Sequence, residues 1–155
     1  MRDRVHVLEN PSVFETLVDR LESTGQISSS GPTLVCTAGY LPQPAYRLLD
    51  LLMASVPGAT LCRYSGDFDP EGLEIASAVL SRYPGRGFPW RLDVADYERG
   101  AKSGLLAEEG QLRGLERMAA AFPELVAAMR WRGVWVYQEA LVEQLFEDVS
   151  VDGSV

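Results

Sequence analysis

The feature that most constrains the fold is the regular alternation of strand and helix signals over the first 92 residues. Three short apolar runs rich in β-branched residues are each followed, after a few turn-forming residues, by an amphipathic segment with helical spacing. The predicted strands cover residues 4–9, 32–37 and 59–64, and the helices after them begin near Pro11, Pro44 and Pro70. Short connections of this kind place the strands parallel, with right-handed crossovers and helices on both faces. The sequence therefore predicts an α/β fold.

Prolines and small polar residues mark the ends of these elements. Asn10-Pro11 and Asp69-Pro70 each combine an N-cap residue with a proline at the first helical position, where the missing N–H costs no hydrogen bond. Pro57-Gly58 is expected to end the second helix. A fourth strand is predicted over Phe88–Leu92, at an edge of the sheet because Pro89 has no N–H to donate to a neighbouring strand.

The pattern changes after residue 92. Ala95–Gly100 is predicted to be a polar connector. Further helices are predicted over residues 111–122, 124–130 and 137–148. The apolar residues of these segments are too few to form a core of their own. We therefore expect a single domain over residues 1–150, in which a β-α core at 4–92 carries a docked helical extension at 93–150.

Composition and charge exclude several classes of protein. The chain has a net charge of −8, from 14 basic and 22 acidic residues, so it is not expected to grip nucleic acid by a basic surface of its own. No apolar run approaches the ~20 residues that a membrane span needs, which predicts a soluble, cytoplasmic protein. Cys36 and Cys62 lie in apolar stretches and are expected to be buried free thiols, and His6 is expected to pack in the core.

Three acids stand directly after predicted strands, where ligands bind in open parallel α/β sheets. Glu9 follows the first strand, and Asp67 and Asp69 follow the third. Asp69 is equally well explained as a helix N-cap, and Glu9 as an acid facing the positive end of the next helix. Asp67 has no capping role by its position.

Convergence of three carboxylates requires a compensating charge. Two like charges ~4 Å apart repel by about 4 kcal/mol at an effective dielectric of ~20. A divalent cation or protonation of one acid relieves that repulsion, and carboxylate oxygens suit Mg²⁺ or Mn²⁺. From spacing alone, a metal site and a purely structural set of acids are equally open.

The segment Gly66-Asp67-Phe68-Asp69-Pro70-Glu71-Gly72, together with the strand-end Glu9, resembles the Toprim domain of primases, topoisomerases and related nucleases. Its D-x-D-P-x-G pattern is similar to that of the topoisomerase VI A subunit and its meiotic relatives. Segments around Glu9, Asp67, Trp90, Asp96 and Glu139 resemble a bacterial family of conserved hypothetical proteins of unknown function. Those proteins carry a Toprim-like C-terminal domain and are similar to the nuclease subunit of the Wadjet plasmid-defence system. The resemblance spans residues 5 to about 148.

The resemblance implies a Toprim-like, Rossmann-like fold with a mostly parallel four-stranded sheet. It also implies Mg²⁺-dependent phosphodiester hydrolysis of nucleic acid, in defence against foreign DNA. Glu9 is then a metal ligand or general acid/base, and Asp67 and Asp69 are metal ligands, with Asp67 also catalytic. Glu139 falls where relatives place a further acid, and a plain first-turn helix acid is the alternative at that position.

The chain departs from the resembled proteins in two respects. No winged-helix domain with a nucleophilic tyrosine fits the sequence, so strand transfer through a tyrosyl ester is not expected. The resembled proteins are also longer, so the chain is expected to be the C-terminal fragment of a protein whose other domain or subunit grips DNA.

Two other functions compete with the nuclease as interpretations of the sequence. One is a non-catalytic Toprim-like module that binds a partner protein or nucleic acid. The other, a phosphoacceptor domain, needs a lysine late in the sheet, and the only lysine, Lys102, lies past the fourth strand. Trp131 and Trp135, with Arg130 and Arg132, offer a base-stacking surface, although packing between helices is the favoured role of the tryptophans.

Overall fold

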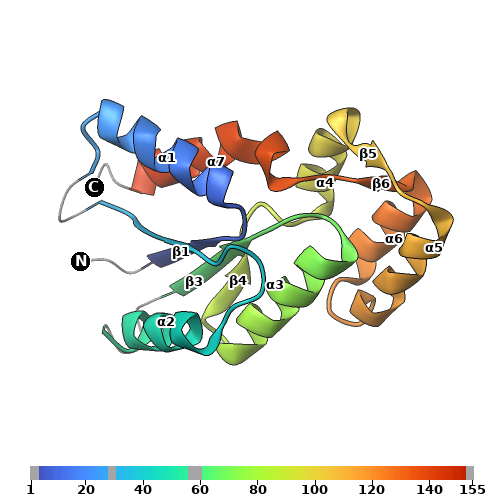
Figure 1. Ribbon diagram of the computed structural model, residues 1–155, viewed down its shortest axis with the longest axis horizontal. Coiled ribbons are helices and arrows are strands. Elements are labelled where there is room, and N and C mark those ends of the chain that lie inside the picture. Colours follow the sequence, from blue (N-terminus) through green and yellow to red (C-terminus); the bar gives the residue numbers. More distant parts are fainter. Residues whose placement is uncertain (1–3, 28–30, 56–60, 153–155) are drawn as a thin grey trace.

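The computed structural model describes residues 4–27, 31–55 and 61–152, with side chains described up to residue 150. Its centre is a four-stranded parallel sheet in the order β2-β1-β3-β4. The strands are β1 (Arg4–Leu8), β2 (Thr33–Cys36), β3 (Leu61–Ser65) and β4 (Gly87–Pro89) (Figure 1). The fold is a Rossmann-like α/β arrangement, as the alternating pattern predicted.

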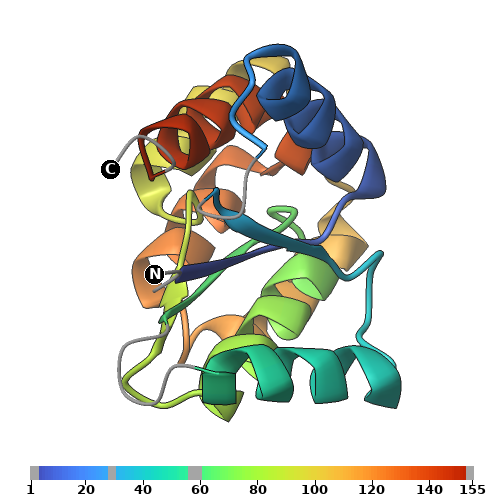
Figure 2. The same ribbon diagram turned by 90° about the vertical axis from the view of Figure 1, so that its left-hand side faces the viewer.

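Helices cover both faces of the sheet, and the strand order explains which helix covers which face. The connecting helices are α1 (Pro11–Ser23), α2 (Gln43–Ser55) and α3 (Pro70–Arg82). The chain leaves β1 in one direction to reach β2, then crosses back over β1 to reach β3, so right-handed crossovers put α1 and α2 on opposite faces. α1 lies beside the C-terminal helix α7 (Val142–Asp152) on one face, and α2 and α3 lie on the other (Figures 1 and 2).

Both predicted N-caps are confirmed. Asn10 Oδ1 accepts hydrogen bonds from the backbone N–H groups of Ser12 (2.9 Å) and Val13 (3.4 Å). Asp69 Oδ1 accepts from the N–H of Gly72 at 2.7 Å. The predicted stop at Pro57-Gly58 lies outside the described residues.

The fourth strand is an edge strand, as expected, but it is shorter than the predicted Phe88–Leu92. After Pro89, the N–H of Trp90 still donates to Tyr64 O at 2.7 Å. Arg91 then adopts a left-handed backbone conformation with φ of 51°, which turns the chain out of the sheet.

The polar connector predicted at Ala95–Gly100 is wrong, because Val94–Gly100 forms a helix, α4. Asp93 caps it by accepting a hydrogen bond from the N–H of Asp96 at 2.9 Å. Asp96 and Tyr97 are buried on its inner side although the segment reads as polar. The burial of Asp96 depends on Arg91, which belongs to another part of the fold. The residues next to Asp96 in the sequence therefore do not indicate that it is buried.

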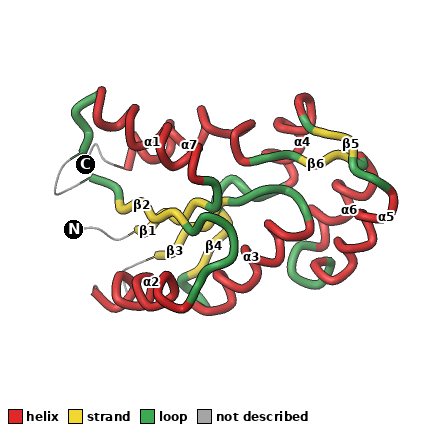
Figure 3. The backbone as a smooth tube through the Cα atoms, viewed as in Figure 1, coloured by secondary structure: helices red, strands yellow, loops and turns green. Residues whose placement is uncertain are grey.

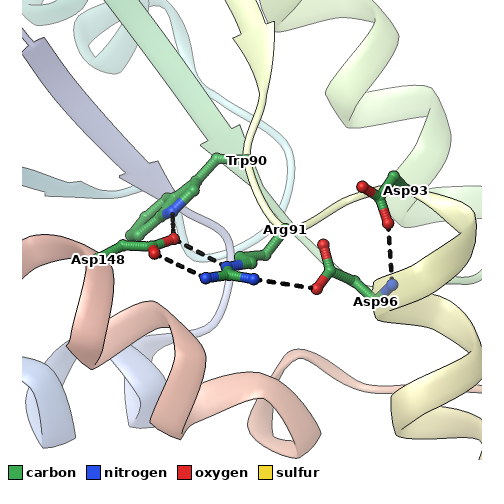
Figure 4. Close-up of polar contacts among 5 residues, drawn as sticks. All are labelled: Trp90, Arg91, Asp93, Asp96 and Asp148. Atoms are coloured by element: carbon green, nitrogen blue, oxygen red, sulfur yellow. Dashed lines mark hydrogen bonds and ion pairs between the residues drawn. The ribbon is translucent and has the colours of Figure 1, made fainter.

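A network of hydrogen bonds and ion pairs joins β4, α4 and α7 (Figure 4). The Arg91 guanidinium donates to both oxygens of Asp148 at 2.8 and 2.7 Å and lies 3.5 Å from Asp96 Oδ1. The buried indole of Trp90 also donates to Asp148, at 2.8 Å. Burial opposes ionisation of Asp148, but the Arg91 and Trp90 hydrogen bonds outweigh it and keep the pKa of that carboxyl below its usual value. The network fastens the last helix to the edge of the sheet.

The C-terminal part is more broken than predicted. Its remaining elements are η1 (Ala101–Ser103), β5 (Leu105–Leu106), α5 (Glu109–Leu112), η2 (Arg113–Met118), α6 (Pro123–Arg132), β6 (Val134–Trp135) and η3 (Gln138–Leu141). The predicted helix 111–122 is therefore split, the predicted helix 137–148 begins as a 3₁₀ turn, and the antiparallel pair of β5 and β6 was not foreseen (Figure 3). Close packing of Gly114 on Pro70, where a Cβ would lie 3.1 Å from the ring, accompanies the break.

One hydrophobic cluster runs through both parts of the chain. It includes Val7 and Tyr64 in the sheet as well as Leu115, Met129 and Leu145 in the extension.

The remaining predictions about buried residues are confirmed with two exceptions, Cys36 and Trp131. His6 is buried with its ring 4.7 Å from that of Trp90. Cys62 is buried, whereas Cys36 is only half-buried. Trp135 is buried, but Trp131 is 89% exposed and does not pack. No helix in the described ranges has the length and apolar character to cross a membrane.

Candidate active site

The candidate site lies where the carboxyl ends of β1 and β3 meet. The two strands are neighbours, and the N–H of Glu9 donates to Ser65 O at 3.2 Å. The chain leaves these two strands toward opposite sides of the sheet, to β2 and to β4, and ligands in open α/β sheets bind in the crevice at such a point. The sequence placed Glu9 and Asp67 at this edge.

Glu9 and Asp67 are in direct contact there. The backbone N–H of Asp67 donates to Glu9 Oε2 at 3.2 Å, and the buried Tyr64 hydroxyl donates to the same oxygen at 3.2 Å. Gly66 permits this approach, since a Cβ at that position would lie 2.4 Å from Glu9 Oε2.

The loop that follows β3 carries both Asp67 and Asp69. Phe68, between them, is fully buried and pairs with Val136, to whose carbonyl its N–H donates at 2.8 Å. This pairing anchors the loop, and the charge of Asp69 lies close enough to Asp67 to raise the pKa of that carboxyl.

The segment after β6 completes the site. Asp67 Oδ1 accepts a hydrogen bond from the N–H of Gln138 at 2.8 Å, so this aspartate has a structural role that its sequence position did not suggest. The Asn10 side chain donates to Glu139 Oε1 at 2.8 Å, which brings the predicted fourth acid to the same edge.

Gln138 was missed as a site residue. It is fully buried, and its Oε1 accepts from the N–H of Asn10 at 3.0 Å, so it joins the end of β1 to the Asp67 loop. Its Nε2 has no hydrogen-bond partner among the described residues. A glutamine in a first helical turn carries no local signal of such a role, because its partners Asn10 and Asp67 are 128 and 71 residues away.

Burial and repulsion between neighbouring carboxylates raise the pKa values of both central acids. Burial, followed by repulsion from Asp67, raises the pKa of Glu9 to about 7. Burial also raises the pKa of Asp67 to about 6; the Gln138 N–H opposes that rise, and the charges of Asp69 and Glu139 add to it. Near neutral pH, Glu9 therefore exchanges a proton readily.

The donor chemistry of these residues suits Mg²⁺ or Mn²⁺, since all are hard carboxylate oxygens and a cation would relieve their repulsion. In their present positions, however, no three His, Cys, Asp or Glu side chains in the described part of the chain are close enough to hold an ion together. Binding would require the carboxylates to turn toward a common point.

A pH dependence of stability follows from the Glu9 pKa. The pKa of Glu9 is about 7 in the fold, above its ordinary 4.5. The folded state therefore holds more protons between these values, and its stability is full below about pH 4.5 and falls as pH rises through 7. After allowance for solvent screening, the expected loss between pH 5 and 8 is on the order of 2 kcal/mol.

Urea unfolding across this range measures the effect. Glu9→Gln should reduce the slope to the smaller part that Asp67, with its pKa raised to about 6, contributes, and should exceed the wild-type stability at pH 8. Glu15→Gln, which removes an exposed charge on α1, should leave the slope intact. An identical slope in the Glu9 variant would assign the effect to another group.

Gly72→Ala should damage the site through the backbone. A Cβ on Gly72 would lie 2.2 Å from Asp67 O, so the Asp67 loop must shift. We expect a loss of about 2 kcal/mol by thermal or urea unfolding. Gly110→Ala is the matched control, because its Cβ would meet nothing within 4 Å, and it should be neutral. Equal stabilities of the two variants would contradict the described packing.

Fold and site together define a Rossmann-like α/β protein with a group of acids at the carboxyl ends of β1 and β3, where the chain leaves these strands toward opposite sides of the sheet. The chain matches the family model described as "Protein of unknown function C-terminus (DUF2399)" over residues 1–149, and it belongs to that family. The comparison with curated proteins found no match.

Proposed function

We propose that this protein is a Toprim-type, Mg²⁺- or Mn²⁺-dependent phosphodiester hydrolase of nucleic acid, related to the Wadjet nuclease subunit and the topoisomerase VI A subunit. The observation that carries the proposal is the hydrogen bond from the backbone N–H of Asp67 to Glu9 Oε2, at 3.2 Å. It lies where the chain leaves β1 and β3 toward opposite sides of the sheet. Two half-buried acids with raised pKa values in a crevice are typical of a reactive centre.

Each residue has a distinct role in this proposal. Asp67 and Asp69 hold the cation, with Glu9 and Glu139 as further ligands; the ion, when bound, neutralises charge on the scissile phosphate and activates water. Glu9 is either that further ligand or the general acid/base; as the acid/base, its metal-free pKa of about 7 lets it hold and transfer a proton near neutral pH. Gln138 keeps Asp67 and the end of β1 in register.

The substrate is proposed to be DNA in the cytoplasm, gripped mainly by another domain or subunit because the chain is acidic. A second candidate is a non-catalytic module that binds a partner protein or nucleic acid. The structural hydrogen bonds of Asp67 and Asp69, to the N–H groups of Gln138 and Gly72, favour that candidate.

Metal titration of the melting temperature tests the proposal. Mg²⁺ or Mn²⁺ should stabilise the protein by ~2.7 kcal/mol at a hundredfold excess over the dissociation constant. Asp67→Asn should remove most of this response and leave the metal-free protein at least as stable, since Asn can still accept from Gln138. The same variant should abolish metal-dependent cleavage of labelled DNA.

Asp69 provides the internal comparison. Asp69→Asn should lose the stabilisation by metal but keep the N-cap of α3, because asparagine can also accept from the Gly72 N–H. Asp69→Ala should also lose the cap, which lowers the stability of the metal-free protein by about 1 kcal/mol. A metal shift that survives Asp67→Asn would place the ion elsewhere and remove the nuclease proposal. Metal binding without any cleavage would favour the non-catalytic module.

A further inference from the structure

A pocket adjoins the acidic site on the side of α4. It has a volume of about 500 Å³ and is lined by Gly100, Ser103, Gly104, Val136, Tyr137, Glu139 and Ala140. Glu139 belongs to both the pocket and the acidic cluster. Tyr137 immediately precedes Gln138, whose N–H lies 2.8 Å from Asp67 Oδ1, so the pocket begins beside the central acids.

Tyr137 offers the pocket an aromatic surface. Its side chain is 40% exposed, whereas Val136 and Gln138 on either side of it are fully buried. Backbone pairing of Phe68 with Val136 holds this segment against the Asp67 loop. Tyr137 therefore lines the pocket beside the site and does not belong to the buried core.

Basic charge lies just beyond the pocket. The turn η1 separates it from a second pocket of about 400 Å³, whose lining includes Arg99, Lys102 and Arg132. Arg132 is paired with Glu98, but within the described residues Arg99 and Lys102 form no ion pair, and both are exposed. Residues 99–132 hold six basic and four acidic residues, although the whole chain has a net charge of −8.

We infer that these two pockets form a binding track for single-stranded nucleic acid. An unpaired base stacks on Tyr137, and the phosphates that follow it along the strand bind Arg99 and Lys102. Acids at one end, an aromatic ring in the middle and two unpaired cations at the other end match the charge and stacking pattern of such a strand. A duplex has its bases stacked on each other, so the track selects an unpaired or extruded base. The inference deepens the proposed function and names its substrate form.

Fluorescence polarisation with a labelled oligothymidylate, in Ca²⁺ to limit hydrolysis, tests the track. We expect weak binding by the wild-type chain, at least fivefold weaker binding by Tyr137→Ala, and recovery in Tyr137→Phe, because stacking contributes ~1–3 kcal/mol per base. An oligonucleotide of the same length with abasic sites should lose affinity for the wild type but not for Tyr137→Ala. A duplex should bind more weakly than the single strand.

Salt dependence tests the cationic end. Arg99→Gln with Lys102→Gln should lower the slope of log affinity against log salt by about 1.4, that is ~0.7 for each phosphate contact. Arg47→Gln on α2, with an exposed side chain on a distant helix, should change it little. Trp131→Ala should leave affinity unchanged; a loss there, with Tyr137→Ala unaffected, would move the stacking surface to α6 and overturn the inference.

The outcomes separate this inference from the proposed function. No detectable binding by the wild type at low salt, or tighter binding of duplex than of single strand, overturns the track but leaves metal-dependent hydrolysis to its own test. Oligonucleotide binding that depends on Tyr137 and Lys102, in a protein that no divalent cation stabilises, supports the track and removes the nuclease.

Discussion

A chain shortened to end at Tyr97 should fail to fold. The removed part contributes nine buried hydrophobic residues to the common core, including Leu115, Met129 and Leu145. Full burial of such a side chain contributes ~1.5–3 kcal/mol, so their sum is at least comparable to the ~5–15 kcal/mol by which a domain is stable. The cut also removes α7 from its face of the sheet, together with the partner of Arg91.

Circular dichroism and thermal unfolding of the shortened and full-length chains give the comparison. We expect no cooperative transition and no native near-ultraviolet signal in the shortened chain. A transition at the full-length midpoint with native spectra would show instead that the β-α core is independent and that the C-terminal elements form a separate unit.

Asp148→Ala should produce the largest loss among the single substitutions considered. It leaves the half-buried Arg91 guanidinium without its bidentate partner and the buried Trp90 indole N–H without an acceptor. Loss of a hydrogen-bonded charge partner at such a site costs about 3 kcal/mol. Because Arg91 also holds a left-handed backbone conformation, we expect the turn after β4 to loosen with it.

Urea unfolding measures this loss, and a surface pair supplies its control. Asp50 also accepts two hydrogen bonds from an arginine, Arg82, at 2.8 and 2.7 Å, and a third from the Tyr83 hydroxyl at 3.1 Å, but Arg82 is exposed and the pair is more accessible to water than Arg91 and Asp148. Asp50→Ala should therefore cost clearly less. The double variant Arg91→Leu with Asp148→Leu should regain part of the stability that Asp148→Ala loses. Equal losses of stability in Asp148→Ala and Asp50→Ala would show that the network does not hold α7 to the sheet.

Two of the sequence-based predictions of secondary structure are wrong for the same physical reason. The segment Ala95–Gly100 reads as a loop because Asp96 is charged, yet the acid is buried within 3.5 Å of Arg91 and the segment is helical. The predicted helix over 111–122 breaks near Gly114, where a Cβ would lie only 3.1 Å from Pro70 of α3. In both segments, contacts with residues distant in sequence override the local pattern.

By itself, the sequence determined the alternation of β1 to α3, the N-caps Asn10 and Asp69, and the position of Glu9 and Asp67 at strand ends. Those features depend on hydrophobic period and on hydrogen bonds between residues close in the chain, which local sequence encodes. Glu139 was expected at the site from the family resemblance. Only the tertiary structure decided that Asn10 holds it there, that Gln138 joins the acids, that Tyr137 stays exposed beside them, and that Arg91 meets Asp148. These contacts bridge residues 57 to 129 positions apart, and their geometry is set by how the last helix packs on the sheet.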